Sequence, residues 1–253
     1  MNKILYILTF FFATITMAQN DDAFSKGNTL YNEGEFQEAI TTYESILATK
    51  LHSTELYFNL ANSYYKLNRI APSIYYYEKA LQLSPKDADI INNLSFAQNM
   101  TIDAIEKVPE VGFYRLVNVI TNAFSFDTWS MFSVTFAILF VILFLAYYFA
   151  YTTLKKRVSF VSSFVVLFLA MFSLFFAFQK QTMDKKDNPA IVFAQESDVK
   201  SEPNLRSESA FQLHEGTKIQ VIDCYKDTWV KIQLDNGKTG WIPIEDIKLF
   251  NNF

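Results

Sequence analysis

The stretch WSMFSVTFAILFVILFLAYYFAY, Trp129–Tyr151, is followed after six residues by a second apolar run, VSFVSSFVVLFLAMFSLFFAF, Val158–Phe178. Neither run contains a charged residue. Each matches the ~20-residue helix that crosses a ~30 Å hydrocarbon core. A backbone in lipid must satisfy its own hydrogen bonds, so we expect two transmembrane helices here. The alternative is a buried helical hairpin in a large soluble core. It fits less well, because aromatic residues near the ends of the runs resemble a membrane-interface belt: Trp129, Tyr147, Tyr148 and Tyr151.

The connection between the runs, residues 152–157, contains Lys155, Lys156 and Arg157. Short loops that are rich in Lys and Arg stay in the cytoplasm, so both flanks of the hairpin should lie on the opposite side. The N-terminus agrees with this orientation. Met1–Ala18 has one early lysine, an apolar core and small residues before Gln19, which predicts a secretory signal peptide cleaved after Ala18. An uncleaved anchor is the alternative.

The composition excludes several classes of function. The 253 residues carry a net charge of −4, so the basic footprint of a nucleic-acid-binding protein is missing and we expect no nucleic-acid partner. The one cysteine, Cys224, and the two histidines, His52 and His214, have no metal-ligand spacing. They also form no visible set of nucleophile, base and orienting group. We therefore expect no enzyme activity, no catalytic or metal site and no cofactor, and we expect Cys224 to be a small buried side chain of a strand.

The region before the apolar runs repeats itself with a shift of 34 residues. The shift aligns Gly27 with Ala61, Asn28 with Asn62, and Tyr43-Glu44 with Tyr77-Glu78. Small residues at the first pair allow two helices to approach closely, and the tyrosines fill the gap beside them. Gly34 and Asn68 suit the left-handed turn between helices, and Ser84 followed by Pro85 suits the start of a further helix.

This period and pattern resemble tetratricopeptide repeats. The resemblance implies units at residues 20–53 and 54–87 and a partial capping helix at 88–100. It also implies that the first helix of each unit lines a concave, peptide-binding face, although these side chains could instead serve packing alone. The residues expected on that face are Phe24, Asn28, Tyr31, Phe58, Asn62, Tyr65 and Lys66.

Residues 101–128 form a polar linker followed by a short amphipathic segment. Phe113, Leu116, Val117, Ile120 and Phe124 fall at helical spacing on one face. Two readings are equally supported: a helix that lies on the bilayer surface before the first span, or a helix that caps the repeats.

The C-terminal part changes to a period of two, as in Val230-Lys231-Ile232-Gln233-Leu234, and Asp235-Asn236-Gly237 predicts a hairpin turn. The order of Leu213–Ile219, Thr228–Ile232 and Gly237–Pro243 resembles a bacterial SH3 domain, here at residues 190–249. Glu202 stands where that family has glycine before Pro203. The resemblance implies a small barrel that binds cell-wall peptides or proteins, with Trp229 and Trp241 as the ligand surface. We expect one of them, Trp241, to belong to the barrel core.

The predicted fold class is therefore a multidomain membrane protein with an all-α tetratricopeptide solenoid, a two-helix transmembrane hairpin (129–151 and 158–178) and a small all-β SH3-like barrel. As a whole, the order of parts resembles BatE proteins of the Bacteroides aerotolerance cluster. That resemblance implies an inner-membrane scaffold with periplasmic modules in an aerotolerance or envelope-stress complex, with von Willebrand A-domain Bat proteins and a MoxR-type ATPase system as partners, beside membrane lipid. The alternative is an envelope sensor whose SH3 module binds peptidoglycan fragments.

Overall fold

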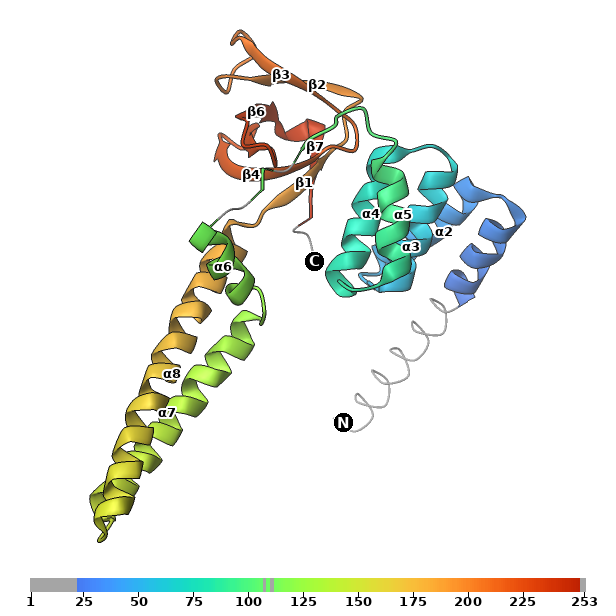
Figure 1. Ribbon diagram of the computed structural model, residues 1–253. Helices are drawn as coiled ribbons and strands as arrows, with labels where there is room; N and C mark the ends of the chain where they lie inside the picture. Colours follow the sequence, from blue (N-terminus) through green and yellow to red (C-terminus); the bar gives the residue numbers. More distant parts are fainter. Residues whose placement is uncertain (1–21, 107, 110–111, 251–253) are drawn as a thin grey trace, which may run out of the picture. The chain divides into compact units, whose positions relative to one another are not determined.

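The computed structural model describes residues 22–106, 108–109 and 112–250. The expected signal peptide lies outside the described residues. The chain divides into two compact units (Figure 1). One unit contains the residues before Val108 together with those from Asn188 onward, and the other is Val108–Asp187.

The first unit begins with helices that pack one against the next. They comprise a helix at residues 22–33, α2 (Phe36–Ala48), α3 (Thr54–Lys66), α4 (Ile70–Leu83) and α5 (Ala88–Gln98). In Figure 1 they run alternately up and down as a stack, coloured from blue to green. We call this stack the repeat domain. The prediction of a helical repeat region is confirmed.

Close approach between paired helices depends on the residues that the 34-residue shift aligned. A Cβ atom added to Gly27 would lie only 2.4 Å from Cε1 of Tyr43, so the tyrosine ring occupies the space that the glycine leaves. In the next unit Ser73 Oγ donates a hydrogen bond to the carbonyl of Ala61 at 3.1 Å. The turn residue Asn68 has a φ of 57°, in the left-handed region that asparagine tolerates better than most residues.

The helix α5 begins at Ala88, the first residue of the expected capping helix, but the predicted cap at Ser84-Pro85 was wrong. The N-cap is Asp87, whose carboxylate accepts hydrogen bonds from the backbone N–H groups of Asp89 and Ile90. A carboxylate at this position also interacts favourably with the helix dipole. Ser84 instead ends α4, and its hydroxyl lies 3.0 Å from that of Thr54.

The strands of the C-terminal part form an antiparallel, SH3-like sheet, as predicted. They are β1 (Pro189–Val192), β2 (Glu196–Lys200), β3 (Ser209–His214), β4 (Lys218–Tyr225), β5 (Trp229–Gln233), β6 (Thr239–Pro243) and β7 (Ile247–Leu249). Their order in the sheet is β3-β2-β6-β5-β4-β1-β7. The turn between β5 and β6 contains Gly237 at a φ of 84°, as the hairpin motif required. We call residues 188–250 the barrel.

Two expectations for the barrel were wrong. Cys224 is exposed, because residues 222–228 at the end of the β4–β5 hairpin are all exposed. Trp241 is only partly buried, since it pairs with Lys231 on the outer face of the sheet. The inward positions of the same strands belong to Val230, Ile232 and Ile242, which are almost completely buried.

The barrel packs on α4 of the repeat domain. Ile191 and Phe250 of the barrel are fully buried in the same apolar cluster as the repeat helices. The ring of Phe250 stacks on that of Tyr75 with the centroids 5.1 Å apart, and the Tyr75 hydroxyl donates to the carbonyl of Leu249 at 3.2 Å. A Cβ atom on Gly216 would lie within 3.1 Å of side-chain atoms of the repeat domain and its adjoining linker.

Polar contacts surround this apolar interface. The carboxylate of Asp103, just after the repeats, accepts hydrogen bonds from the backbone N–H of His214 at 2.7 Å and from the Thr217 hydroxyl at 2.6 Å. Its other oxygen lies 2.9 Å from His214 Nδ1. Burial opposes ionisation of Asp103, but these hydrogen bonds outweigh it and lower its pKa below the ordinary value. Lys218 and Glu78 form a further ion pair at 2.8 Å.

The second unit consists of α6 (Gly112–Thr121), α7 (Phe126–Phe149) and α8 (Thr153–Lys186). The helices α7 and α8 run side by side along their length (Figure 1). Small side chains of α8 lie in their contact, as in membrane helix pairs, where small residues allow the backbones to approach. These buried residues are Ser163, Ala170, Ser173 and Ala177.

The two long helices are long and apolar enough to cross a membrane. The ends of these two helices differ from the ends of the spans expected from the sequence, 129–151 and 158–178. Lys155, Lys156 and Arg157 do not form a loop but lie in the first turns of α8, and the connection is only residues 150–152. The positive charges remain at the bend of the hairpin, which is the feature that the orientation rule uses.

Candidate functional site

A groove of about 350 Å³ lies along the first helices of the repeat domain. Its walls come from the helix at residues 22–33, from α3 and from α5. The ring of Tyr77 on α4 forms part of its floor. The residues that line it are Tyr31, Phe58, Asn62, Tyr65, Lys66, Tyr77, Asn93 and Phe96. Most of them are aromatic or amide side chains, so the groove offers flat apolar surfaces and hydrogen-bonding groups together.

The asparagines of the groove hold neighbouring helices together. Asn62 Oδ1 accepts hydrogen bonds from the Tyr77 hydroxyl at 2.5 Å and from Asn93 Nδ2 at 3.1 Å. The preceding unit repeats this arrangement, with Asn28 Oδ1 accepting from Tyr43 at 2.7 Å and from Asn59 at 2.9 Å. Because the oxygen of Asn62 is already engaged, the group of this side chain that suits a ligand is its N–H₂, a hydrogen-bond donor.

Two tyrosines that line the groove have raised pKa values. Burial raises the pKa of Tyr77 well above its ordinary value, and burial also raises the pKa of Tyr31. Both phenols therefore stay neutral. Lys66 is exposed at the end of α3 and supplies the positive charge of the groove. The groove thus combines neutral aromatic walls with one cation at its margin.

Five of the seven residues predicted for the concave face line this groove: Tyr31, Phe58, Asn62, Tyr65 and Lys66. The other two lie elsewhere. The Asn28 oxygen is used inside the repeat, as described above. Phe24 lines a separate hollow with Leu51 and Leu56, and its ring packs against that of Tyr43 with the centroids 5.9 Å apart.

Three groove residues escaped the sequence analysis: Tyr77, Asn93 and Phe96. A signal for Phe96 was present, because it lies 34 residues after Asn62, which was expected on the concave face. The fifth helix of the stack, α5, was treated only as a cap, so its side chains were not considered. Tyr77 was assigned to packing, and it also forms part of the floor.

The second candidate surface lies on the outer face of β4, β5 and β6. Trp241 contacts Tyr225 edge to face with the ring centroids 6.2 Å apart, and Lys231 Nζ lies 6.0 Å above the Trp241 ring. Trp229 is paired with Tyr225 on one side and with Pro243 on the other. Both predicted tryptophans are partly exposed and lie on neighbouring strands, so they contribute to one aromatic surface with a cation beside it.

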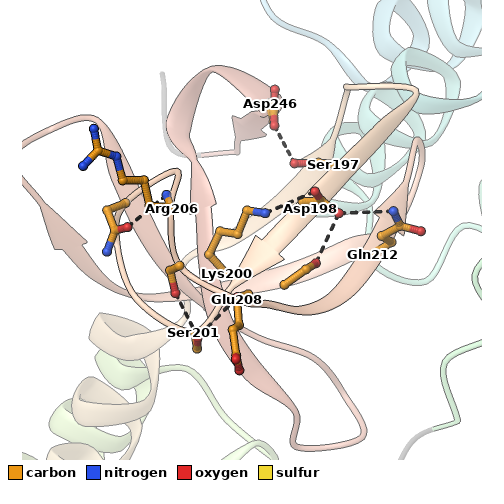
Figure 2. A network of polar contacts seen from close by, with 11 residues as sticks. Ser197, Asp198, Lys200, Ser201, Arg206, Glu208, Gln212 and Asp246 are labelled. Atoms are coloured by element: carbon orange, nitrogen blue, oxygen red, sulfur yellow. Dashed lines mark hydrogen bonds and ion pairs between the residues drawn. The ribbon is translucent and has the colours of Figure 1, made fainter.

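A polar network fixes the β2–β3 hairpin next to this face (Figure 2). Asp198 on β2 accepts hydrogen bonds from Lys200 at 3.2 Å, Gln212 at 3.1 Å and Ser209 at 3.2 Å. The neighbouring Ser197 donates to the carboxylate of Asp246, which joins β2 to the segment before β7. The bonds of Asp198 lie within the β2–β3 hairpin and that of Ser197 ties β2 to the segment before β7, so we assign them to stability.

The loop between β2 and β3 accommodates the replacement of glycine by Glu202. Among the described residues, positive φ values at non-glycine positions occur only at Lys50, Asn68, Lys226 and Asp227, so Glu202 needs no left-handed backbone. Its N–H donates to the Ser207 hydroxyl at 3.0 Å, which closes the loop.

Comparison with known families agrees with both folded parts. Residues 54–87 match the tetratricopeptide repeat family, and residues 197–248 match the bacterial SH3 domain family. The first match covers the second of the two expected repeat units. A comparison with curated proteins returned no match. The chain therefore contains a tetratricopeptide repeat and a bacterial SH3 domain.

Proposed function

We propose that this chain is a membrane-anchored scaffold whose repeat domain holds an extended segment of a partner protein. Repeat stacks of this kind present long concave surfaces that suit such segments. The presence of tetratricopeptide and SH3 modules supports a protein-binding role in general.

The observation that carries the proposal is the composition of the groove. Phe58 of α3 and Phe96 of α5 both line the groove and offer apolar surface to the side chains of a bound segment. The N–H₂ of Asn62 and the ammonium of Lys66 can both donate to its backbone carbonyls or to an acidic side chain. An extended peptide exposes carbonyls at regular intervals and alternates its side chains, so it uses both kinds of surface.

The anchor is the pair α7 and α8. Their 24 and 34 residues correspond to lengths of about 36 and 51 Å at 1.5 Å per residue, more than the ~30 Å apolar core of a bilayer. Apolar side chains on both helices face outward, which water would disfavour and lipid accepts. Because short segments rich in Lys and Arg stay on the cytoplasmic side, we propose that the bend faces the cytoplasm at a bacterial inner membrane and that the repeat domain and the barrel lie in the periplasm.

The proposed partners and cellular role of this scaffold are based on the resemblance of the chain to BatE proteins. We propose von Willebrand A-domain proteins and a MoxR-type ATPase system as members of the same complex, with a role in aerotolerance or envelope stress. The aromatic face around Trp241 would bind a partner protein or a cell-wall peptide. In this proposal the chain assembles other proteins and carries out no reaction itself.

A photo-crosslinking experiment tests the groove. With a benzoylphenylalanine at position 96, a discrete polypeptide should be captured in intact cells, because this side chain lines the groove and is 59% exposed. The matched control places the same probe at position 91, which is also exposed on α5 but does not line the groove. It should capture several-fold less of that polypeptide.

A second variant makes the result specific to the groove. Lys66→Glu reverses the charge of an exposed side chain and leaves the packed core unchanged. It should reduce capture from position 96 by about fivefold or more, which corresponds to the loss of about 1 kcal/mol. Equal capture from positions 91 and 96, or capture that does not respond to Lys66→Glu, would contradict the proposed binding site.

A further inference from the structure

The short helix α6 exposes large apolar side chains on its outer face. Asn118 and Thr121 are buried against the rest of the second unit. Phe113, Leu116 and Val119 are 79%, 54% and 62% exposed. Val117 and Ile120 pack partly buried against the cluster of Trp129 and Phe176, so α6 carries apolar side chains on its outer face as well as on its inner one. On a water-soluble protein the outer face of a packed helix is polar. The exposed face of α6 therefore suits an apolar solvent.

The depth of α6 along the hairpin is fixed by specific contacts. The Trp129 indole N–H donates to the carbonyl of Thr121 at 3.1 Å, and the Trp129 ring stacks on Phe176 with the centroids 5.2 Å apart. Two residues after Phe176 the apolar run of α8 ends, and Lys180 donates to Asn122 Oδ1 at 3.0 Å. The C-terminal end of α6 thus lies level with the transition from apolar to polar residues on α8.

That transition is where a spanning helix leaves the hydrocarbon and enters the headgroup region. The sequence suits this zone, since Tyr114 of α6 and Trp129 of α7 have the amphipathic rings that collect there. Residues 112–121 contain Arg115 and no acidic residue, which favours contact with anionic headgroups. The first turns of α7 likewise expose apolar side chains, Met131 and Val134.

We propose that α6 lies in the membrane interface on the side away from the hairpin bend, with Phe113, Leu116 and Val119 inserted among the lipid acyl chains. This inference rests on the proposed crossing of the membrane by α7 and α8. In addition to the two spanning helices, α6 would contact lipid along the membrane surface. Trp129 and Lys180 hold it to the spanning helices. Of the two readings left open by the sequence, it selects the helix on the bilayer.

Spin-label accessibility in the full-length chain tests the proposal. The chain, carrying Cys224→Ser, is reconstituted into vesicles of phosphatidylcholine with one quarter phosphatidylglycerol. Single nitroxide labels are placed through Leu116→Cys, Val119→Cys and, in the middle of α7, Val141→Cys. Collision with apolar oxygen and with a water-soluble nickel chelate is measured for each label. We expect labels 116 and 119 to favour oxygen, at a depth of about 5–10 Å below the headgroups, and label 141 to lie deeper.

The reference label separates the possible failures. If label 141 is deep while labels 116 and 119 collide mainly with the nickel chelate, α6 lies in water and the inference is overturned, although the crossing stands. If labels 116 and 119 are shielded from both reagents, protein covers this face and the inference is again overturned. If label 141 itself collides with the nickel chelate, the crossing fails and the inference fails with it.

Discussion

Replacing Gly216 with valine is expected to release the barrel from the repeat domain. Gly216 has a φ of 85°, and a Cβ atom there would lie 2.9 Å from Thr101 Cγ2, 3.0 Å from Ile70 Cγ2 and 3.1 Å from Ile74 Cδ1. Overpacking of this kind costs about 1–3 kcal/mol. Since the crowded atoms belong to the repeat domain and the linker after it, separation of the two surfaces relieves the strain. The docked state should lose about 5- to 150-fold in population.

The ion pair between Lys218 and Glu78 provides the measurement. Its 2.8 Å separation allows a carbodiimide to join the two side chains directly, and mass spectrometry detects the linked peptides. The yield should fall sharply in Gly216→Val.

The matched control is Gly237→Val. Gly237 has nearly the same φ, 84°, but a Cβ atom there meets nothing within 4 Å. This variant carries the backbone strain of about 1–2 kcal/mol without the collision, so its crosslink yield should stay close to that of the unmodified chain. Fluorescence of Trp229 and Trp241 should show that the barrel remains folded in both variants. Equal yields in the two variants would mean that Gly216 does not hold the docked state.

Replacing Tyr77 with alanine is expected to destabilise the repeat domain by about 3–5 kcal/mol, the range for removal of a large buried ring. The side chain is 1% exposed, and its hydroxyl bonds to Asn62. A small domain is stable by only about 5–15 kcal/mol, so this single change removes a large part of the total. Hydrogen exchange of peptides from α3 and α4 should accelerate by about 100-fold or more.

The variant Tyr77→Phe removes the hydroxyl and keeps the ring, so it measures the contribution of the hydroxyl alone. The ring remains, and Asn62 Oδ1 still accepts from Asn93, so the cost should be about 0.5–1.5 kcal/mol. The same change at Tyr43, the equivalent residue of the preceding unit, should cost a similar amount because Asn28 keeps its bond from Asn59. An alanine variant that exchanges no faster than the phenylalanine variant would show that the ring does not hold these helices together.

Local sequence patterns were sufficient to predict the separate parts of the fold. The 34-residue spacing of Gly27, Tyr43, Ala61 and Tyr77 reflects a steric requirement within each helix pair, so it is visible in the sequence alone. The hairpin turn at Gly237 is similar, because a positive φ leaves few choices of residue. Most of the groove followed from the same period, since equivalent positions of successive helices face the same side.

Contacts between the parts could not be predicted in this way. Tyr75, Ile191 and Phe250 meet in one apolar cluster, although Tyr75 is more than 100 residues away from the other two. No periodicity connects them. Asp103 resembled an ordinary linker residue until the structure placed His214 and Thr217 around its carboxylate. The sequence alone therefore could not tell whether the repeat domain and the barrel touch.

The errors inside each part have the same origin. Cys224 lies in the strand-like run of β4, but residues 222–228 at the end of this hairpin are all exposed. Trp241 is as apolar as a core residue, yet the strand register turns it outward beside Lys231. The N-cap of α5 is Asp87 and not the predicted Ser84. Both residue types are good N-caps, so the residue type alone does not say which of them begins the helix.

The orientation of the anchored scaffold can be measured most directly through Cys224, the one cysteine of the chain, which is exposed on the barrel. In bacterial spheroplasts that express the full chain, a membrane-impermeant maleimide should label Cys224 without permeabilisation. A second variant, Cys224→Ser with Thr152→Cys, places the thiol at the hairpin bend and should be labelled only after the membrane is opened. Labelling of Cys224 that requires permeabilisation, together with free labelling at position 152, would contradict a scaffold whose folded domains lie outside the cytoplasm.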